Sequence, residues 1–140
     1  LIVFDSNYRE TLWKSKKAAR LIIRKYWQIV DIALPSLDDE KNIFDFKTQE
    51  EVLKNLKQLG VKFGALKRGS EGPYSLSSHN DIINYDVVTK VKDTTAAGDS
   101  FNGAYLASLI NGLSQEISLV SGHKLASRVI KFNGAIIPIQ

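Results

Sequence analysis

The sequence predicts an α/β fold, built on a mostly parallel sheet with helices on both faces. Short apolar runs at 1–5, 29–34 and 61–67 alternate with segments of helical periodicity at 15–29 and 48–59. Such alternation is typical of β-α-β units, in which each helix crosses over the sheet to start the next parallel strand.

Helix ends in the first half carry their own signals. Ser36 precedes acidic residues, which predicts a helix N-cap with carboxylates in the first turn. Thr48 and Glu51 have the spacing of a capping box, and apolar residues at helical spacing follow them. Gly60 then marks the end of this helix.

In the second half, two short extended pieces are expected around 74–76 and 82–89. Helices are expected at about 97–112 and 115–132. The sequence shows no linker, repeat or low-complexity segment between these elements. The organisation therefore predicts one continuous α/β architecture.

Composition excludes several classes of protein. The chain has 140 residues, of which 44% are hydrophobic and 24% charged, as expected for a globular domain with a core. It has no Cys, so disulfides and Cys-based zinc sites are excluded and a reducing cytoplasm fits. No apolar run approaches the roughly 20 residues of a membrane span. We expect a cytoplasmic protein without a membrane partner.

The net charge of +4 raises the question of nucleic-acid binding. Many basic residues lie between Lys14 and Lys25, where they form the polar face of the expected helix. No aromatic stacking array or base-reading motif accompanies them, so we expect no nucleic-acid partner. The excess charge can still attract an anionic substrate or nucleotide.

The most informative segment is 93–105, with the sequence DTTAAGDSFNGAY. Ala96, Ala97 and Gly98 carry almost no side chain and lead into an expected helix, whose first amides and dipole attract anions. Asp99 lies at the same place. From the residues alone, this carboxylate is either a helix cap or a base that takes a proton from an incoming hydroxyl.

This segment resembles the second signature of the ribokinase-like (pfkB) carbohydrate kinases, DTTGAGDSF, with Ala96 in place of the first Gly. The resemblance implies that Asp99 is the catalytic base next to the acceptor hydroxyl. It also implies that the amides of Ala97 and Gly98 form an anion hole, with Ala96 in the nucleotide site. We expect Ala96 to have a small effect, because the 2-keto-3-deoxygluconate kinase branch uses Ala there.

Two further segments resemble the same branch. Residues 4–13, FDSNYRETLW, imply that Asn7 and Arg9 contact the nucleotide and that Arg9 also meets the sugar acid. A guanidinium suits this role because its planar fork holds a carboxylate or phosphate with two hydrogen bonds. The alternative is a surface Arg after a strand. Residues 134–138, GAIIP, resemble the terminal signature, and Asn133 beside them is assigned to the nucleotide.

A Gly-rich turn, KRGSEG at 67–72, follows directly after an expected strand. Ligands of open α/β sheets bind beyond the carboxyl ends of the strands, so this turn is well placed for a nucleotide. On its own, the pattern fits an ordinary turn equally well. The resemblance implies that Lys67, Gly69, Ser70 and Gly72 contact ATP. The Gly-Lys-Ser/Thr ending of a Walker loop is absent.

The acidic residues 38–40 offer oxygen ligands for Mg²⁺, with Asp39 as the candidate through water. The family often has Asn-x-x-Glu here, and Ser36 and Asp39 occupy those places. Helix capping by Ser36 and dipole neutralisation by Asp39 explain the same residues without a metal, so both alternatives stay open. His79 and His123 have no partner at metal-ligand spacing and are expected to be structural.

The resemblance implies an ATP- and Mg²⁺-dependent kinase that phosphorylates the terminal hydroxyl of 2-keto-3-deoxy-D-gluconate to the 6-phosphate. Its expected partners are this sugar acid and ATP. The alternatives are a ribokinase- or fructokinase-like kinase of another sugar, or a non-catalytic nucleotide-binding fragment.

The resemblance covers only the C-terminal half of such kinases. Residues 1–140 are therefore expected to be the C-terminal part of a single kinase domain with a three-layer α/β/α sandwich. The N-terminal half and the β-sheet lid, which carry most sugar contacts, are missing. We expect the isolated chain to be inactive, and a homo-oligomer would form through the missing lid.

Overall fold

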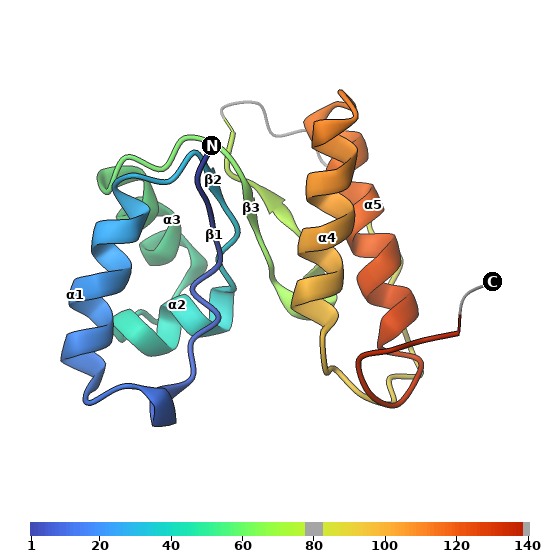
Figure 1. Ribbon diagram of the computed structural model, residues 1–140, viewed down its shortest axis with the longest axis horizontal. Helices are drawn as coiled ribbons and strands as arrows, with labels where there is room; N and C mark the ends of the chain where they lie inside the picture. Colours follow the sequence, from blue (N-terminus) through green and yellow to red (C-terminus); the bar gives the residue numbers. More distant parts are fainter. Residues whose placement is uncertain (78–82, 139–140) are drawn as a thin grey trace. The chain divides into compact units, whose positions relative to one another are not determined.

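The computed structural model describes residues 1–77 and 83–138 (Figure 1). The chain divides into two compact units. Among the described residues, the first unit contains 1–68 and 74–77, and the second contains 69–73 and 83–138.

The first unit begins with the predicted β-α-β arrangement. Strand β1 (Val3–Phe4) pairs in parallel with β2 (Ile32–Ala33). Helix α1 (Lys16–Trp27) connects them, and the side chain of Ser15 caps its N-terminus by accepting a hydrogen bond from the Ala18 amide. A crossover helix between parallel strands is the arrangement that the apolar periodicity predicts.

The sheet continues with β3 (Ala65–Leu66), which pairs antiparallel with β4 (Tyr74–Ser75). A parallel bridge between Ala33 and Gly64 joins the β2 and β3 segments, which lie next to each other in Figure 1. Gly64 has φ +136°, and a Cβ there would lie 1.8 Å from the carbonyl oxygen of Ala33. Only glycine allows the two backbones to approach this closely.

Two helices complete the first unit, α2 (Leu37–Phe44) and α3 (Gln49–Gln58). The capping box is confirmed: the hydroxyl of Thr48 accepts from the Glu51 amide at 3.3 Å, and the Glu51 carboxylate accepts from the Thr48 amide at 3.1 Å. Ser36 is the N-cap residue of α2, but its side chain makes no capping hydrogen bond. The sequence therefore predicted the N-cap position of Ser36 correctly, but its predicted side-chain capping bond is absent.

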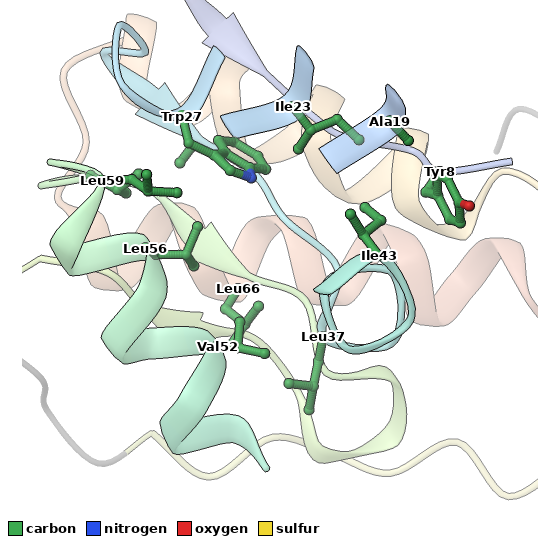
Figure 2. Close-up of a cluster of buried hydrophobic side chains, with 12 residues drawn as sticks. Tyr8, Ala19, Ile23, Trp27, Leu37, Ile43, Val52, Leu56, Leu59 and Leu66 are labelled. Atoms are coloured by element: carbon green, nitrogen blue, oxygen red, sulfur yellow. The ribbon is translucent and has the colours of Figure 1, made fainter. Parts of the chain in front are cut away.

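The core of the first unit lies where α1, α2 and α3 turn their apolar faces toward one another and the sheet. Figure 2 shows these side chains pointing into one cluster. Phe4 of β1 packs edge-on against the Trp27 ring, with centroids 4.7 Å apart. The labelled members of the cluster are Tyr8, Ala19, Ile23, Trp27, Leu37, Ile43, Val52, Leu56, Leu59 and Leu66.

The second unit is built on α4 (Ala97–Ile110) and α5 (Gln115–Val129), which pack along each other (Figure 1). Both end slightly earlier than the sequence predicts. The ring of Phe101 fits against Gly122 of α5, where a Cβ would lie 2.7 Å from it. Among the described residues, no helix combines the length and apolar character needed to cross a membrane.

The second predicted extended piece, at 82–89, is not part of a sheet in its described residues. Residues 83–88 form no strand, although the other extended piece is confirmed as β4. Within this segment, Tyr85 packs against a helix: its ring lies 4.8 Å from the ring of His123 on α5. The Asp86 carbonyl is likewise hydrogen-bonded to the His123 side chain, at 2.9 Å. Ile82 and His79 lie outside the described residues.

We expect Thr48→Ala to lower the free energy of unfolding by about 1 kcal/mol, because the Glu51 amide loses its capping acceptor. Chemical denaturation measures this change. Lys54→Ala, at an exposed position of the same helix, is the control and should change stability by less than about 0.5 kcal/mol. Equal effects of the two substitutions would contradict a stabilising role of the capping box.

Candidate functional site

The residues predicted to form the site are divided between the two units. Both groups combine loop backbone with charged side chains. The first unit carries Asn7, Arg9, Asp39 and Lys67, and the second carries Gly69, Ser70, Gly72, Ala96, Ala97, Gly98, Asp99 and Asn133.

In the second unit, the small-residue turn leads directly into α4, as predicted. Ala96 is the N-cap residue and has left-handed backbone angles, φ +60° and ψ 12°. Asp99 is the third residue of the helix and is exposed. Because Ala96 occupies the N-cap position, Asp99 is not the N-cap residue. Two roles remain for the Asp99 carboxylate: neutralising the helix dipole or acting as a general base.

The amides of this first turn are not equivalent. The Ala97 amide donates to the carbonyl oxygen of Thr94 at 3.1 Å, so it is engaged within the turn. The amide of Gly98 lies one residue further into the helix, where amides have no intrahelical acceptor. In this conformation, Gly98 and the helix dipole offer the stronger attraction to an anion.

A carboxylate that the sequence analysis did not select fixes this turn. Asp93 Oδ1 accepts hydrogen bonds from the Thr95 amide at 2.8 Å and the Thr95 hydroxyl at 2.7 Å. Its Oδ2 accepts from the Gly134 amide at 2.8 Å. Hydrogen bonds from the Thr95 hydroxyl, the Thr95 amide and the Gly134 amide lower the pKa of Asp93. Asp93 thus joins the turn before α4 to the segment that contains Asn133.

The sequence did contain a signal for this role. An Asp followed two residues later by Thr is typical of an Asx turn, in which the carboxylate accepts the amide two positions on. The bond to Gly134 spans 41 residues and has no local signal. Only the tertiary structure brings the two segments together.

The Gly-rich turn also lies in the second unit. Gly69–Glu71 form a short 3-10 helix, and both Gly69 and Gly72 have positive φ, +57° and +77°. A Cβ on Gly72 would lie 2.3 Å from the Tyr85 ring, so glycine is required here for both reasons. Tyr85 also packs on His123. It therefore lies between the predicted nucleotide turn and α5 and contacts both.

A pocket of about 480 Å³ lies beside His123. His123 Nε2 donates a hydrogen bond to the Asp86 carbonyl at 2.9 Å, and the Ser127 hydroxyl lies 3.3 Å from the same nitrogen; both contacts hold the ring at the pocket wall. Four basic side chains against one carboxylate favour an anionic ligand. The pocket is lined by Asp86, Val87, Val88, Thr89, Lys90, His123, Lys124, Ser127, Arg128 and Lys131.

The sequence predicts a structural role for His123 and does not predict the pocket beside it. A usable signal was present, since Lys124, Arg128 and Lys131 recur at the spacing of one helix face. What the spacing does not show is that residues 86–90 lie opposite that face and close the pocket.

In the first unit, the Lys67 ammonium forms an ion pair with Asp5. Their side chains are 14% and 19% exposed, so the pair is largely shielded from water. Asp5 also accepts a hydrogen bond from the Asn7 amide at 3.0 Å. The charge of Lys67, which the resemblance assigned to ATP, is therefore balanced by a carboxylate in this structure.

Arg9 ends the loop that starts at Asp5 and is exposed. Its Nη1 donates to the Tyr8 carbonyl at 3.1 Å, which leaves four of the five guanidinium N–H groups for other acceptors. Asn7, which is also exposed, has positive φ, +34°. The loop thus presents Asn7 and Arg9 outward on a bent backbone.

The first turn of α2 packs against this loop. Asp39 Oδ2 accepts from the Tyr8 amide at 3.2 Å, and Glu40 Oε1 accepts from the Ser6 hydroxyl at 3.1 Å. Burial raises the pKa of Asp39, against the lowering effect of the Tyr8 amide. Burial also raises the pKa of Glu40 to about 8. Asp39 thus has three candidate roles: accepting the Tyr8 amide, neutralising the helix dipole and binding a metal ion.

Comparison with known proteins identifies the family. The profile of pfkB family carbohydrate kinases matches residues 2–140, and the chain belongs to this family. It is 38% identical to 2-dehydro-3-deoxygluconokinase of Escherichia coli strain K12 over 98% of its length, and 37% identical to that of Dickeya dadantii over 99%. It covers 46% of each, so the chain spans about half the length of these curated relatives.

Solved structures confirm the ribokinase-like fold class. A putative ribokinase II from E. coli in complex with ATP and Mg²⁺ superimposes with a TM-score of 0.79 at 25% identity. The match covers 96% of this chain and 44% of that one. Placement of residues 1–140 as the C-terminal part of a single kinase domain stays a prediction.

Ala96→Gly is expected to raise the free energy of unfolding by about 0.5–1 kcal/mol, because glycine adopts the left-handed conformation without the Cβ penalty. Ala107→Gly is the matched control, since Ala107 is exposed in the interior of the same helix. It should lower stability by about 1 kcal/mol. Denaturation curves showing the same sign for both substitutions would contradict the strain at Ala96.

Asp93→Asn is expected to lower stability at neutral pH, because an amide nitrogen cannot accept the Gly134 hydrogen bond. Since folding lowers the pKa of Asp93 from 3.8, its carboxylate stabilises the protein above that value, and the stabilisation is lost as pH falls through the lower folded pKa. The difference between wild type and variant should shrink below about pH 4.

Unfolding curves at several pH values measure this difference. Asp86→Asn, which neutralises an exposed carboxylate of the same unit, is the control and should shift stability by less than about 0.5 kcal/mol. A penalty for Asp93→Asn that stays constant down to pH 2 is incompatible with the proposed hydrogen bonds to an ionised Asp93.

Proposed function

We propose that the protein transfers the γ-phosphoryl group of ATP to the terminal hydroxyl of 2-keto-3-deoxy-D-gluconate, with this chain supplying the nucleotide site and the catalytic base. The observation that carries the proposal is the exposed Asp99 in the first turn of α4, directly after a small-residue turn. The relatives named 2-dehydro-3-deoxygluconokinase support the choice of sugar acid.

Most of the residues assigned to the nucleotide lie in the second unit. Its Gly69–Gly72 turn packs on Tyr85, Tyr85 packs on His123, and His123 borders the basic pocket. A pocket of this size with an excess of cationic side chains suits a phosphate-bearing ligand with a planar base. Ser70 and Asn133 are assigned to the same ligand on the resemblance of their motifs.

In the transfer, Asp99 accepts the proton of the terminal hydroxyl as its oxygen attacks the γ-phosphorus. The new bond joins that oxygen to phosphorus, and the bond between phosphorus and the bridging oxygen of ADP breaks. The amide of Gly98 and the positive end of α4 stabilise the negative charge of the transferring group. The Ala97 amide can contribute once its bond to Thr94 opens.

Arg9 is the candidate for holding an anion in the first unit. Its exposed guanidinium suits the carboxylate of a sugar acid or a nucleotide phosphate. The ion pair with Asp5 holds Lys67 at the end of the sheet. When a nucleotide binds, a phosphate can replace the Asp5 carboxylate as the partner of the Lys67 ammonium.

Mg²⁺ would neutralise phosphate charge when bound with ATP. The described residues contain no group of three His, Cys, Asp or Glu side chains that could hold a metal ion. A nucleotide-borne Mg²⁺ needs only one or two carboxylates beside phosphates and water. Asp39 fits this limited role through water, because only its Oδ2 is engaged by the Tyr8 amide.

The cytoplasm is the proposed location, since ATP and phosphorylated sugar acids are intracellular metabolites and the chain has no Cys to form disulfides. A homo-oligomer formed through a lid stays a prediction.

Asp99→Asn in the complete protein is expected to lower kcat at least about 100-fold, because the hydroxyl loses its general base. The Kd for ATP should change less than about threefold, since the nucleotide is held by other groups. A coupled assay with 2-keto-3-deoxy-D-gluconate, ribose and fructose measures turnover, and calorimetry measures ATP binding.

Glu116→Gln is the matched control, because Glu116 is the first-turn carboxylate of α5 in the same unit. It should leave kcat within about twofold of wild type, because Glu116 is not among the residues assigned to the base, the nucleotide or the sugar acid. Near-normal turnover of Asp99→Asn would sink the assignment of the base. Turnover of ribose or fructose but not of the sugar acid would favour the alternative acceptors, and ATP binding without turnover would favour a nucleotide-binding module.

A further inference from the structure

The loop that carries Asn7 and Arg9 is anchored to α2 on both sides of Asn7. Ser6 precedes Asn7 and donates its hydroxyl proton to Glu40, at 3.1 Å. Tyr8 follows Asn7 and donates its amide proton to Asp39, at 3.2 Å. The two acceptors are consecutive residues in the first turn of one helix.

Glu40 is an unusual residue at its position. Its side chain is completely buried, whereas glutamate is rarely buried without a partner that compensates its desolvation. The partner it has is Ser6; its second oxygen, Oε2, has no hydrogen-bond partner in the described structure. The indole of Trp27 lies close enough to lower the pKa of Glu40, yet its Nε1 is likewise without a hydrogen-bond acceptor there.

Packing alone does not explain a carboxyl group here. The neighbouring core residues of α2, Leu37 and Ile43, are apolar and buried, and a leucine at position 40 would fill the same space without a desolvation cost. Among the described residues, the hydrogen bond that the Glu40 carboxyl group makes is the one from Ser6, and the nearby Trp27 indole also favours an oxygen here. The bond from Ser6 offsets part of the desolvation cost of Glu40.

We infer that Glu40 is a positioning residue that, through Ser6, fixes the loop in the conformation that presents Asn7 and Arg9 to the anionic group of the substrate. Asn7 has φ +34°, a conformation that a non-glycine residue keeps only when its neighbours hold it. Loss of the Ser6–Glu40 bond lets the backbone of Asn7 relax toward negative φ. Arg9 then no longer points toward the anionic group of the substrate. The role of the loop rests on the proposed function.

The two sides of Asn7 are held by different kinds of contact. Tyr8 and Ile43 belong to the same core cluster (Figure 2), so the end of the loop beyond Asn7 is also held by apolar packing. Before Asn7, the contacts that hold the loop are polar: the Ser6 hydroxyl bonds to Glu40, and Asp5 accepts the Asn7 amide and pairs with Lys67. Loss of the Ser6–Glu40 bond should therefore loosen the segment from Ser6 to Asn7 without unfolding the core.

The test uses the complete protein with two pairs of variants. Ser6→Ala and Glu40→Leu remove the bond from either side. Ser6→Thr keeps a hydroxyl and Glu40→Gln keeps an acceptor, so these two should recover most of what is lost. Ile43→Val removes a buried methylene group of the same helix and leaves both partners of the Ser6–Glu40 bond in place, so it serves as the control for general destabilisation.

We expect Ser6→Ala and Glu40→Leu to raise the KM for the sugar acid about 3- to 10-fold, the cost of one hydrogen bond, with kcat within about twofold of wild type. Amide hydrogen exchange at Asn7 and Tyr8 should accelerate by a similar factor. Ser6→Thr and Glu40→Gln should return both quantities toward wild type, and Ile43→Val should change neither.

Unchanged exchange in both Ser6→Ala and Glu40→Leu would overturn the inference, whatever the acceptor. So would an equal rise in KM for Ile43→Val, or accelerated exchange with an unaltered KM. If the wild-type protein phosphorylates a different sugar, the proposed acceptor is wrong and the KM comparison is made with that sugar. If it phosphorylates none, the exchange rates alone decide whether Glu40 fixes the loop.

Discussion

Hydrogen bonds from loop amides to carboxylates are the interaction on which the candidate site depends. The loops between the short strands and the helices have amides without a ladder or helix partner, and such groups are costly to leave unsatisfied. Asp5 accepts the Asn7 amide, Asp39 the Tyr8 amide, and Asp93 the amides of Thr95 and Gly134. Each of these carboxylates holds a segment that carries predicted site residues.

This constraint separates the acidic residues by role. Asp5, Asp39 and Asp93 are engaged in holding backbone, and Lys67 is balanced by Asp5. Asp99 differs, because it is exposed in the first turn of α4 and is not the cap residue. A base must be free to take a proton, whereas a structural acceptor must stay ionised and bonded. The contrast between the exposed Asp99 and these backbone-bonded carboxylates therefore supports the proposed role of Asp99 as the base.

Local signals predicted the local structure well. The capping box at Thr48 is confirmed because both of its bonds lie within one helical turn. The extended piece expected at 82–89 joins no sheet in its described residues, because the sequence pattern cannot distinguish pairing with a strand from packing against a helix, as Tyr85 packs on His123. Ser36 was placed correctly as N-cap, yet its hydroxyl does not make the capping bond.

The sequence by itself determined the α/β class, the family resemblance and the residues of the kinase motifs, because these depend on periodicity and on short contiguous strings. Only the tertiary structure decided which charges are free. The ion pair of Lys67 with Asp5, the anchoring of Ser6 by buried Glu40 and the closing of the pocket beside His123 all join segments distant in the chain. Hydrogen bonds and burial depend on proximity in space, and spacing along the sequence does not encode it.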